Sequence, residues 1–190
     1  MVFYKEVRWH GRGGQGAVTS AELLASAAVK NGLYAVSIPF FGAERRGAHV
    51  FAFNRISDKP ILLKSMIKTP DYVIVLDSKL LKLKEHREKV LGGLKENSIL
   101  VVNATEEELK DLKWSKVAFV DATEIVLKHG LVLAGIPLTN TAMLGAFAKI
   151  FEKIPPEKYE ESIEDKWGRK KAEINIEVFR EGYRNVRWMR

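Results

Sequence analysis

The feature that most constrains this chain is a glycine-rich segment near its amino terminus, placed between two stretches of different periodicity. Residues 6–10 alternate like a strand, whereas residues 17–30 are rich in Ala and Leu and predict a helix that Asn31 and Gly32 end. Between them stand Gly11, Arg12, Gly13, Gly14, Gln15 and Gly16. Glycines permit a sharp turn, and the following helix presents free N–H groups to an anion. The pattern predicts an anion-binding strand, loop and helix; the alternative is that the glycines serve only a tight turn.

Further segments predict strands at residues 34–38, 49–56, 72–76, 99–102 and 117–120. The uninterrupted apolar run 72–76 is typical of a parallel strand buried on both faces. Helical patterns follow the last three strands, with Ser78 as the expected cap of the first of these helices. Because strands alternate with helices, the predicted fold class is α/β, with a doubly wound, mostly parallel, Rossmann-like sheet and carboxyl-terminal helices.

The last third of the chain predicts helices of a different kind. Thr139 is expected to cap a helix in which Gly145 and its small neighbours permit close packing, and Pro155 with Pro156 then breaks the chain. The sequence beyond is strongly charged, with apolar residues spaced as in one or two amphipathic helices. We therefore expect a glycine-loop domain over residues 1–155 and a helical extension over residues 156–190, packed on that domain or on a partner subunit.

Composition excludes several classes of function. Lys and Arg number 31 against 24 Asp and Glu, a formal net charge of +7 that favours anionic partners. Cysteine is absent, so the chain supplies neither a thiol nucleophile nor the thiolates of an iron–sulfur cluster. No apolar run approaches the ~18 residues of a membrane span, so we expect a cytoplasmic protein without a membrane partner. Nucleic acid is not an expected partner, because Lys and Glu are interspersed over residues 82–89 as on a solvated helix face.

The end of the second predicted strand argues against a dinucleotide site. A dinucleotide-binding domain places Asp or Glu there, about 20 residues after the glycines, to hold the ribose hydroxyls. This chain has Ser37 and Ile38 instead. The missing carboxylate argues against NAD, whereas Arg12, Gly14 and Gln15 favour a highly phosphorylated ligand. An independent Rossmann-type nucleotide-binding protein or dehydrogenase is the alternative function.

The second predicted strand leads into a motif of aromatic, glycine and basic residues, expected near the glycine loop at the carboxyl edge of the sheet. Arg45 and Arg46 can grip phosphates in fork geometry. Phe40 and Phe41 either stack on a ligand or are core or interface residues. Glu44 either belongs to the site or pairs with an arginine.

Three motifs together carry a resemblance to a known family. They are residues 11–16, 39–47 and 140–146. In their order and spacing they closely resemble the gamma subunit, or gamma domain, of the pyruvate and 2-oxoacid:ferredoxin oxidoreductases. The similarity continues through Lys166, Trp167 and residues 175–182, so it spans nearly the whole chain.

The resemblance implies a CoA-acylating, multi-subunit oxidoreductase, of which pyruvate synthase is an example. Such an enzyme decarboxylates a 2-oxoacid on thiamine diphosphate, passes electrons through [4Fe-4S] clusters to ferredoxin and transfers the acyl group to coenzyme A. This chain has no Cys and no Gly-Asp-Gly stretch, so thiamine diphosphate, Mg and the clusters are expected in the alpha, beta and delta partner subunits. The gamma subunit is then expected to bind CoA and to organise the complex.

The residues expected to contact CoA come from the three motifs. They are Gly11, Arg12, Gly13, Gly14, Gln15, Gly16, Phe41, Gly42, Glu44, Arg45, Arg46 and Asn140. In this interpretation the loop backbone contacts phosphate or pantetheine and the arginines supply charge. The alternative is that Arg12 or Gln15 faces a neighbouring subunit near the thiamine site.

No catalytic residue and no metal site are expected in this chain. The four histidines, which lack metal-ligand spacing, are His10, His49, His86 and His129. For His10, beside the glycine loop, a structural or hydrogen-bonding role is expected rather than a chemical one. Asp77 and Asp121, each at the end of a predicted strand, either line the cleft or cap a helix.

Overall fold

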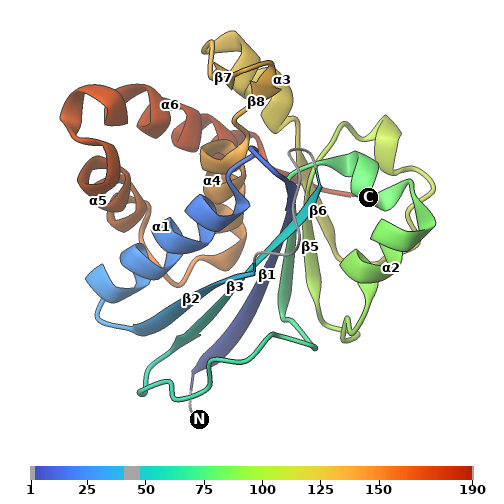
Figure 1. Ribbon diagram of the computed structural model, residues 1–190, viewed down its shortest axis with the longest axis horizontal. Coiled ribbons are helices and arrows are strands. Elements are labelled where there is room, and N and C mark those ends of the chain that lie inside the picture. Colours follow the sequence, from blue (N-terminus) through green and yellow to red (C-terminus); the bar gives the residue numbers. More distant parts are fainter. Residues whose placement is uncertain (1–2, 41–47, 190) are drawn as a thin grey trace.

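The computed structural model describes residues 3–40 and 48–189 as an α/β sheet with helices on both faces (Figure 1). The strands of the main sheet are β1 (Tyr4–Arg12), β2 (Tyr34–Phe40), β3 (His49–Ser57), β4 (Tyr72–Val75), β5 (Ile99–Asn103), β6 (Val117–Val120) and β9 (Arg187–Trp188). A small hairpin consists of β7 (Val132–Leu133) and β8 (Ile136–Pro137). The helices are α1 (Ala17–Lys30), α2 (Lys84–Leu91), α3 (Ala122–Lys128), α4 (Asn140–Phe151), α5 (Pro156–Trp167) and α6 (Arg169–Asn185), with 3₁₀ turns η1 (Ser78–Leu81) and η2 (Glu107–Leu109).

The main sheet has the strand order β2-β3-β1-β4-β5-β6-β9. β1, β4, β5 and β6 are parallel, and β2 shares their direction because it is antiparallel to β3, which is antiparallel to β1. β3 and β9 run the other way, so the predicted mostly parallel sheet is confirmed. β3 reverses because eight residues, 41–48, separate it from β2. A crossover between parallel strands needs about a dozen or more.

The central strands are buried between two apolar cores, one on each face of the sheet. In β4, Val73 and Val75 pack in the core that contains residues of η1 and α2, whereas Ile74 packs in the core that contains residues of α1, α4 and α6. Successive strand side chains point to opposite faces, which explains the uninterrupted apolar run in the sequence. Figure 1 shows α1, α4, α5 and α6 together on one face and α2 on the other.

The last two helices contribute to the larger of these cores. Tyr159 of α5 and Phe179 of α6 are fully buried and stack on each other, with ring centroids 5.5 Å apart. α6 also crosses α4 backbone against backbone. A Cβ at Gly145 would overlap the carbonyl oxygen of Phe179, and a Cβ at Gly182 would overlap that of Ala142. The predicted close packing of the helix around Gly145 is confirmed.

Two expected helix caps are not found. Asp77, rather than Ser78, caps the turn after β4: its Oδ1 accepts a hydrogen bond from the Lys79 N–H at 2.9 Å. This bond begins the 3₁₀ turn η1, and the α-helix starts later, in α2. Thr139 stands at the amino end of α4, but its Oγ1 donates to the carbonyl oxygen of Leu76 at 3.5 Å and does not cap the helix. Ser78 Oγ donates to Glu108 Oε1 at 2.9 Å, so both hydroxyl groups bond atoms outside the helices that they were expected to cap.

Candidate functional site

The glycine loop lies at the edge of the sheet where the parallel strands end. β1 ends at Arg12, and the turn into α1 contains Gly14 and Gly16 in the left-handed region, with φ of 98° and 86°. The loop is joined to the start of β3, because the Gly13 N–H donates to the carbonyl oxygen of Ala48 at 2.9 Å. The predicted strand, loop and helix are confirmed.

Two of the loop glycines are packed against the chain itself. A Cβ at Gly16 would lie 2.8 Å from Asn140 Cγ, and a Cβ at Gly14 would lie 2.9 Å from Ile136 Cδ1. Their positive φ values disfavour other residues independently of this packing. The tight turn therefore accounts for Gly14 and Gly16 without a ligand, and what the loop offers a ligand is its backbone.

Two helices direct their amino termini to this loop. At the starts of α1 and α4, the cap residues Gly16 and Thr139 supply no side-chain hydrogen bond to the first turn among the described residues. The helices are joined where they meet: Ser20 Oγ donates to the carbonyl oxygen of Asn140 at 3.2 Å, and Asn140 is buried. The start of α1 presents free N–H groups and a partial positive charge to an anion, and the start of α4, where residues 139–142 are buried, adds the partial positive charge of its own terminus.

Arg12 and Gln15 are both directed to Asp77. Arg12 Nε forms an ion pair with Asp77 Oδ2 at 2.9 Å, and Gln15 Nε2 lies 3.5 Å from the same oxygen. Gln15 Oε1 also accepts a hydrogen bond from the Arg12 N–H at 2.7 Å. The Arg12 charge is thus balanced within the chain, although its side chain stays 32% exposed.

Beside the loop lies a cleft of about 370 Å³ at the carboxyl ends of β4 and β5, reaching the start of α3. Its lining carries the carboxylates of Asp77, Glu108 and Asp121, with Lys79 as the cation among the described lining residues. Asp121 also caps α3, its Oδ1 accepting a hydrogen bond from the Glu124 N–H at 2.8 Å. This net negative lining disfavours a phosphate in the cleft, so the geometry favours an anion against the glycine loop.

Part of the predicted site lies outside the described residues, namely Phe41, Gly42, Glu44, Arg45 and Arg46. The residues on either side of them are described. Phe40 ends β2 and pairs with Phe51, and His49 begins β3 and pairs with Arg12. Both flanks are therefore at the same edge of the sheet as the glycine loop.

The structure also brings together three histidines that sequence reasoning treated as scattered. His10 Nδ1 lies 2.9 Å from His49 Nε2, and His49 Nδ1 lies 3.2 Å from His86 Nδ1. The row leads from the fully buried His10 to the partly exposed His86 on α2. Across residues 3–40 and 48–189, no set of three or more potential ligands is arranged to hold a metal ion. No local motif signals the row, because its members come from three elements far apart in the sequence.

Comparison with known proteins identifies the family. The model of the family described as pyruvate ferredoxin/flavodoxin oxidoreductase matches residues 6–185. The chain belongs to this family. The resemblance seen in the sequence is thereby confirmed, and the chain is a subunit of a pyruvate/2-oxoacid ferredoxin oxidoreductase. The alternative of an independent nucleotide-binding protein or dehydrogenase gains no support.

Two relatives of this oxidoreductase subunit match it along nearly their whole length, and a third, longer protein shares the fold over part of its chain. The common gamma subunit of the pyruvate and ketoisovalerate oxidoreductases of Pyrococcus furiosus is 48% identical over 183 residues, which is 94% of this chain and 95% of that protein. The crystal structure of pyruvate oxidoreductase subunit PORC from Thermotoga maritima has a TM-score of 0.82 and 36% identity, covering 98% of this chain and 99% of that one. A 2-oxoglutarate:ferredoxin oxidoreductase from Magnetococcus marinus shares the fold, with a TM-score of 0.75 and 19% identity over 94% of this chain and 30% of its own.

In this oxidoreductase subunit two histidines of the row, His10 and His49, are held in their neutral form. Burial, and after it the positive charges of His86, Lys89, Arg12 and Arg8, lower the pKa of His49 to about 4. Burial, followed by Arg8 and His49, lowers the pKa of His10 well below 6.5. At neutral pH, His10 and His49 are therefore uncharged hydrogen-bonding groups, as expected for His10.

Acidification is expected to destabilise the subunit through this row. Between pH 6.5 and about 4 these histidines bind protons in the unfolded chain but not in the folded chain. Acid therefore favours the unfolded chain, and the free energy of unfolding falls as pH falls. Each pH unit in this window costs up to about 1.4 kcal/mol for each imidazole. Urea unfolding at pH 7.5, 6.5, 5.5 and 4.5 measures the slope. The His49→Gln variant should show a smaller slope, and an unchanged slope would mean that other groups cause the pH dependence.

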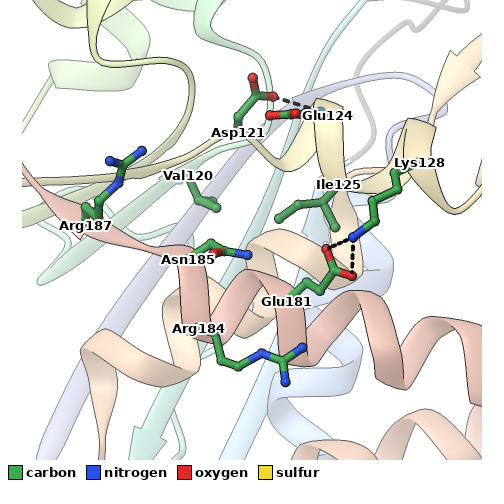
Figure 2. Close-up of a pocket in the computed structure, with 9 residues that line it drawn as sticks. All are labelled: Val120, Asp121, Glu124, Ile125, Lys128, Glu181, Arg184, Asn185 and Arg187. Carbon is green, nitrogen blue, oxygen red and sulfur yellow. Dashed lines mark hydrogen bonds and ion pairs between the residues drawn. The ribbon is translucent and has the colours of Figure 1, made fainter.

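A separate hollow of about 540 Å³ lies between α3, α6 and the segment leading into β9 (Figure 2). Its lining residues are Val120, Asp121, Glu124, Ile125, Lys128, Glu181, Arg184, Asn185 and Arg187. Figure 2 shows Lys128 and Glu181 pointing toward each other, and their ion pair measures 3.1 Å. Three carboxylates balance three cations around this hollow. It therefore has less attraction for a phosphorylated ligand than the glycine loop, although it is larger than the cleft beside that loop.

No helix in the described part of the chain is both long and apolar enough to cross a membrane.

Proposed function

We propose that this chain is the gamma subunit that binds coenzyme A in an enzyme that oxidatively decarboxylates pyruvate or a related 2-oxoacid to acyl-CoA and reduces ferredoxin. CoA carries a pyrophosphate and a 3′-phosphate, and both are anionic. In this proposal the pyrophosphate lies against the glycine loop, and the subunit also organises the complex. The decarboxylation and the electron transfer take place in other subunits.

The observation that carries this proposal is the convergence of the starts of α1 and α4 on the glycine loop. The start of α1 has no side-chain cap among the described residues, so its N–H groups can bind an anion, and the buried start of α4 contributes its partial positive charge. The flanks of the motif that contains Arg45 and Arg46 lie at the same sheet edge. Because Asp77 balances the charge of Arg12, we assign the cationic contacts with the 3′-phosphate to Arg45 and Arg46.

The division of labour with other subunits follows from the composition of this chain. The absence of Cys leaves the [4Fe-4S] clusters to a partner, proposed as the delta subunit. Thiamine diphosphate and Mg are assigned to the alpha and beta subunits. The structure of the Magnetococcus marinus enzyme, whose fold this chain shares, was solved with 2-oxoglutarate, coenzyme A and succinyl-CoA bound. That observation is compatible with a CoA role in the complex and assigns no residue here.

Replacing Arg45 and Arg46 by methionine is expected to weaken CoA binding roughly 100-fold. A hydrogen bond to a charged group contributes about 1.5–3 kcal/mol, and about 1.4 kcal/mol corresponds to a factor of ten. Isothermal titration of the full chain with CoA, dephospho-CoA and pantetheine measures the effect. Dephospho-CoA should bind more weakly than CoA to the unchanged chain, and the double variant should lose this difference. In the assembled enzyme, KM for CoA should rise while KM for the 2-oxoacid stays unchanged.

The matched control removes the same charge from the opposite edge of the sheet. Lys113 and Lys116 precede β6 at its amino end, so the Lys113→Met/Lys116→Met variant should bind CoA like the unchanged chain. Two results would contradict the proposal. One is equal loss of affinity in both double variants, which would indicate a general charge effect. The other is CoA binding by the assembled enzyme with no dependence on Arg45 and Arg46.

A further inference from the structure

β2 is an edge strand of the main sheet and has an unusual composition for that position. β2 stands at the end of the strand order, and among the described residues it pairs with β3 alone. Its seven residues include no charged side chain and none that is fully buried. Soluble proteins usually protect such an edge with charges, prolines or a covering segment. Here Pro39 protects only the end of the strand, so within residues 3–40 and 48–189 nothing pairs with the outer backbone edge of residues 34–38.

An apolar groove accompanies this free edge. It has a volume of about 390 Å³ and is lined by Val29, Gly32, Leu33, Tyr34, Ala35, Val36 and Ile61. Ile61 belongs to the loop between β3 and β4, which runs along the end of the sheet near the amino terminus (Figure 1). In the same loop Leu62, Leu63 and Met66 are 92%, 54% and 50% exposed. Ile61 connects this loop to the groove, and we call the free edge of β2, the groove and the exposed side chains of Leu62, Leu63 and Met66 together the β2 surface.

The backbone of the loop that carries these exposed apolar side chains is bound by a buried arginine. Arg55 has a side chain only 2% exposed and forms an ion pair with Glu6 at 2.9 Å. Its Nη1 donates to the carbonyl oxygens of Leu63 and Ser65, at 3.3 Å and 2.6 Å. A buried arginine thus anchors the backbone of the loop whose apolar side chains face outward. Such preorganisation lowers the entropic cost of binding a partner.

The charges around the β2 surface specify the partner. Lys59, Lys64 and Lys68 are exposed, and none forms an ion pair with a residue in the described part of the chain. Many other lysines do so, as Lys95 does with Asp71. In a two-fold dimer of this chain the β2 surface, which carries these three lysines and one neighbouring exposed carboxylate, Asp58, would face a copy of itself with the same excess of positive charge, which disfavours self-association. A partner with carboxylates at the same positions is favoured.

We propose that the β2 surface docks an extended, apolar segment, bordered by carboxylates, of another subunit of the same oxidoreductase. The segment adds to the free edge of β2 through backbone hydrogen bonds and places side chains in the groove and against Leu62 and Met66. The inference rests on the chain being a subunit of a multi-subunit enzyme and is independent of CoA binding.

The test compares assembly of surface variants with the other subunits of the enzyme, one of which carries an affinity tag. Leu62→Asp/Met66→Asp changes exposed residues, so its thermal unfolding should match that of the unchanged chain. Its affinity for the tagged subunits should fall roughly 100-fold, as expected for central apolar contacts of an interface. Lys64→Glu should weaken assembly less, and mainly at low salt. The control Leu133→Asp changes a side chain of the β7–β8 hairpin that is 63% exposed and should assemble normally.

Two outcomes would overturn the proposal. In the first, Leu62→Asp/Met66→Asp assembles with unchanged affinity. In the second, light scattering shows that the unchanged chain is a dimer that this variant makes monomeric without affecting assembly, so that a second copy is the occupant. Titration of Leu62→Asp/Met66→Asp with CoA shows which of the two proposals has failed. Its CoA affinity should not change, because the β2 surface is not expected to contact CoA.

Discussion

Replacing Gly145 by alanine is expected to lower the free energy of unfolding by about 3 kcal/mol or more. The added Cβ would overlap the carbonyl oxygen of Phe179, so α4 and α6 must separate and open the core between them. For a chain of this size about 1 kcal/mol corresponds to about 2–4 °C in Tm, so Tm should fall by about 6–12 °C. Urea and thermal unfolding, followed by circular dichroism, measure both quantities.

The direction of the stability change distinguishes a glycine that packs against another backbone from a glycine in an unpacked helix. In an unpacked helix, alanine in place of glycine would stabilise by about 0.5–1 kcal/mol. Gly130→Ala is the matched control: its φ is 67°, but a Cβ there meets no atom within 4 Å, so it should cost only about 1–2 kcal/mol. Gly182→Ala acts at the same crossing, and the double variant should be less than additive. A Gly145→Ala variant as stable as the unchanged chain would contradict the packing.

Replacing Asn54 by leucine is expected to cost about 2–4 kcal/mol. Asn54 is fully buried, and its Oδ1 accepts a hydrogen bond from Trp9 Nε1 at 2.8 Å. Its Nδ2 donates to the carbonyl oxygens of Ala21 at 2.8 Å and Val36 at 3.3 Å. Leucine has a similar size but leaves the Trp9 N–H buried without an acceptor. The free energy of unfolding, measured by urea titration, reports the loss.

A double-mutant cycle separates the lost hydrogen bond from a change in shape. Trp9→Phe removes the orphaned donor, so Trp9→Phe/Asn54→Leu should be less destabilised than the sum of the two single changes. Asn54→Asp tests the role of charge: at neutral pH it buries a carboxylate and should destabilise further. Strict additivity in the cycle would mean that the Trp9–Asn54 bond contributes nothing.

Local sequence was enough to predict the elements around the site. Residues 6–32 specify a strand, a turn and a helix because alternation, glycines and the Asn-Gly stop all act over a few neighbouring positions. The apolar run of β4 similarly indicated burial on both faces. The crossing at Gly145 was also predicted from its small residues, although its partner helix was not.

Contacts between distant residues escaped prediction. The pairing of Arg12 with Asp77, and the histidine row through His10, His49 and His86, depend on which strands and helices become neighbours. Local capping preferences likewise failed at Ser78, because Asp77 at the strand end competes for the same N–H groups. Each of these groups has several partners compatible with its local sequence.

The sequence alone determined the α/β class, the glycine loop, the family and the absence of thiol and cluster chemistry, because these depend on residue type and short-range spacing. The tertiary structure decided the reversed direction of β3, the balanced charge of Arg12, the packing of two loop glycines against Asn140 and Ile136, and the free edge of β2. These depend on strand order and helix placement, which are set by the burial of apolar surface over the whole chain rather than by any one segment.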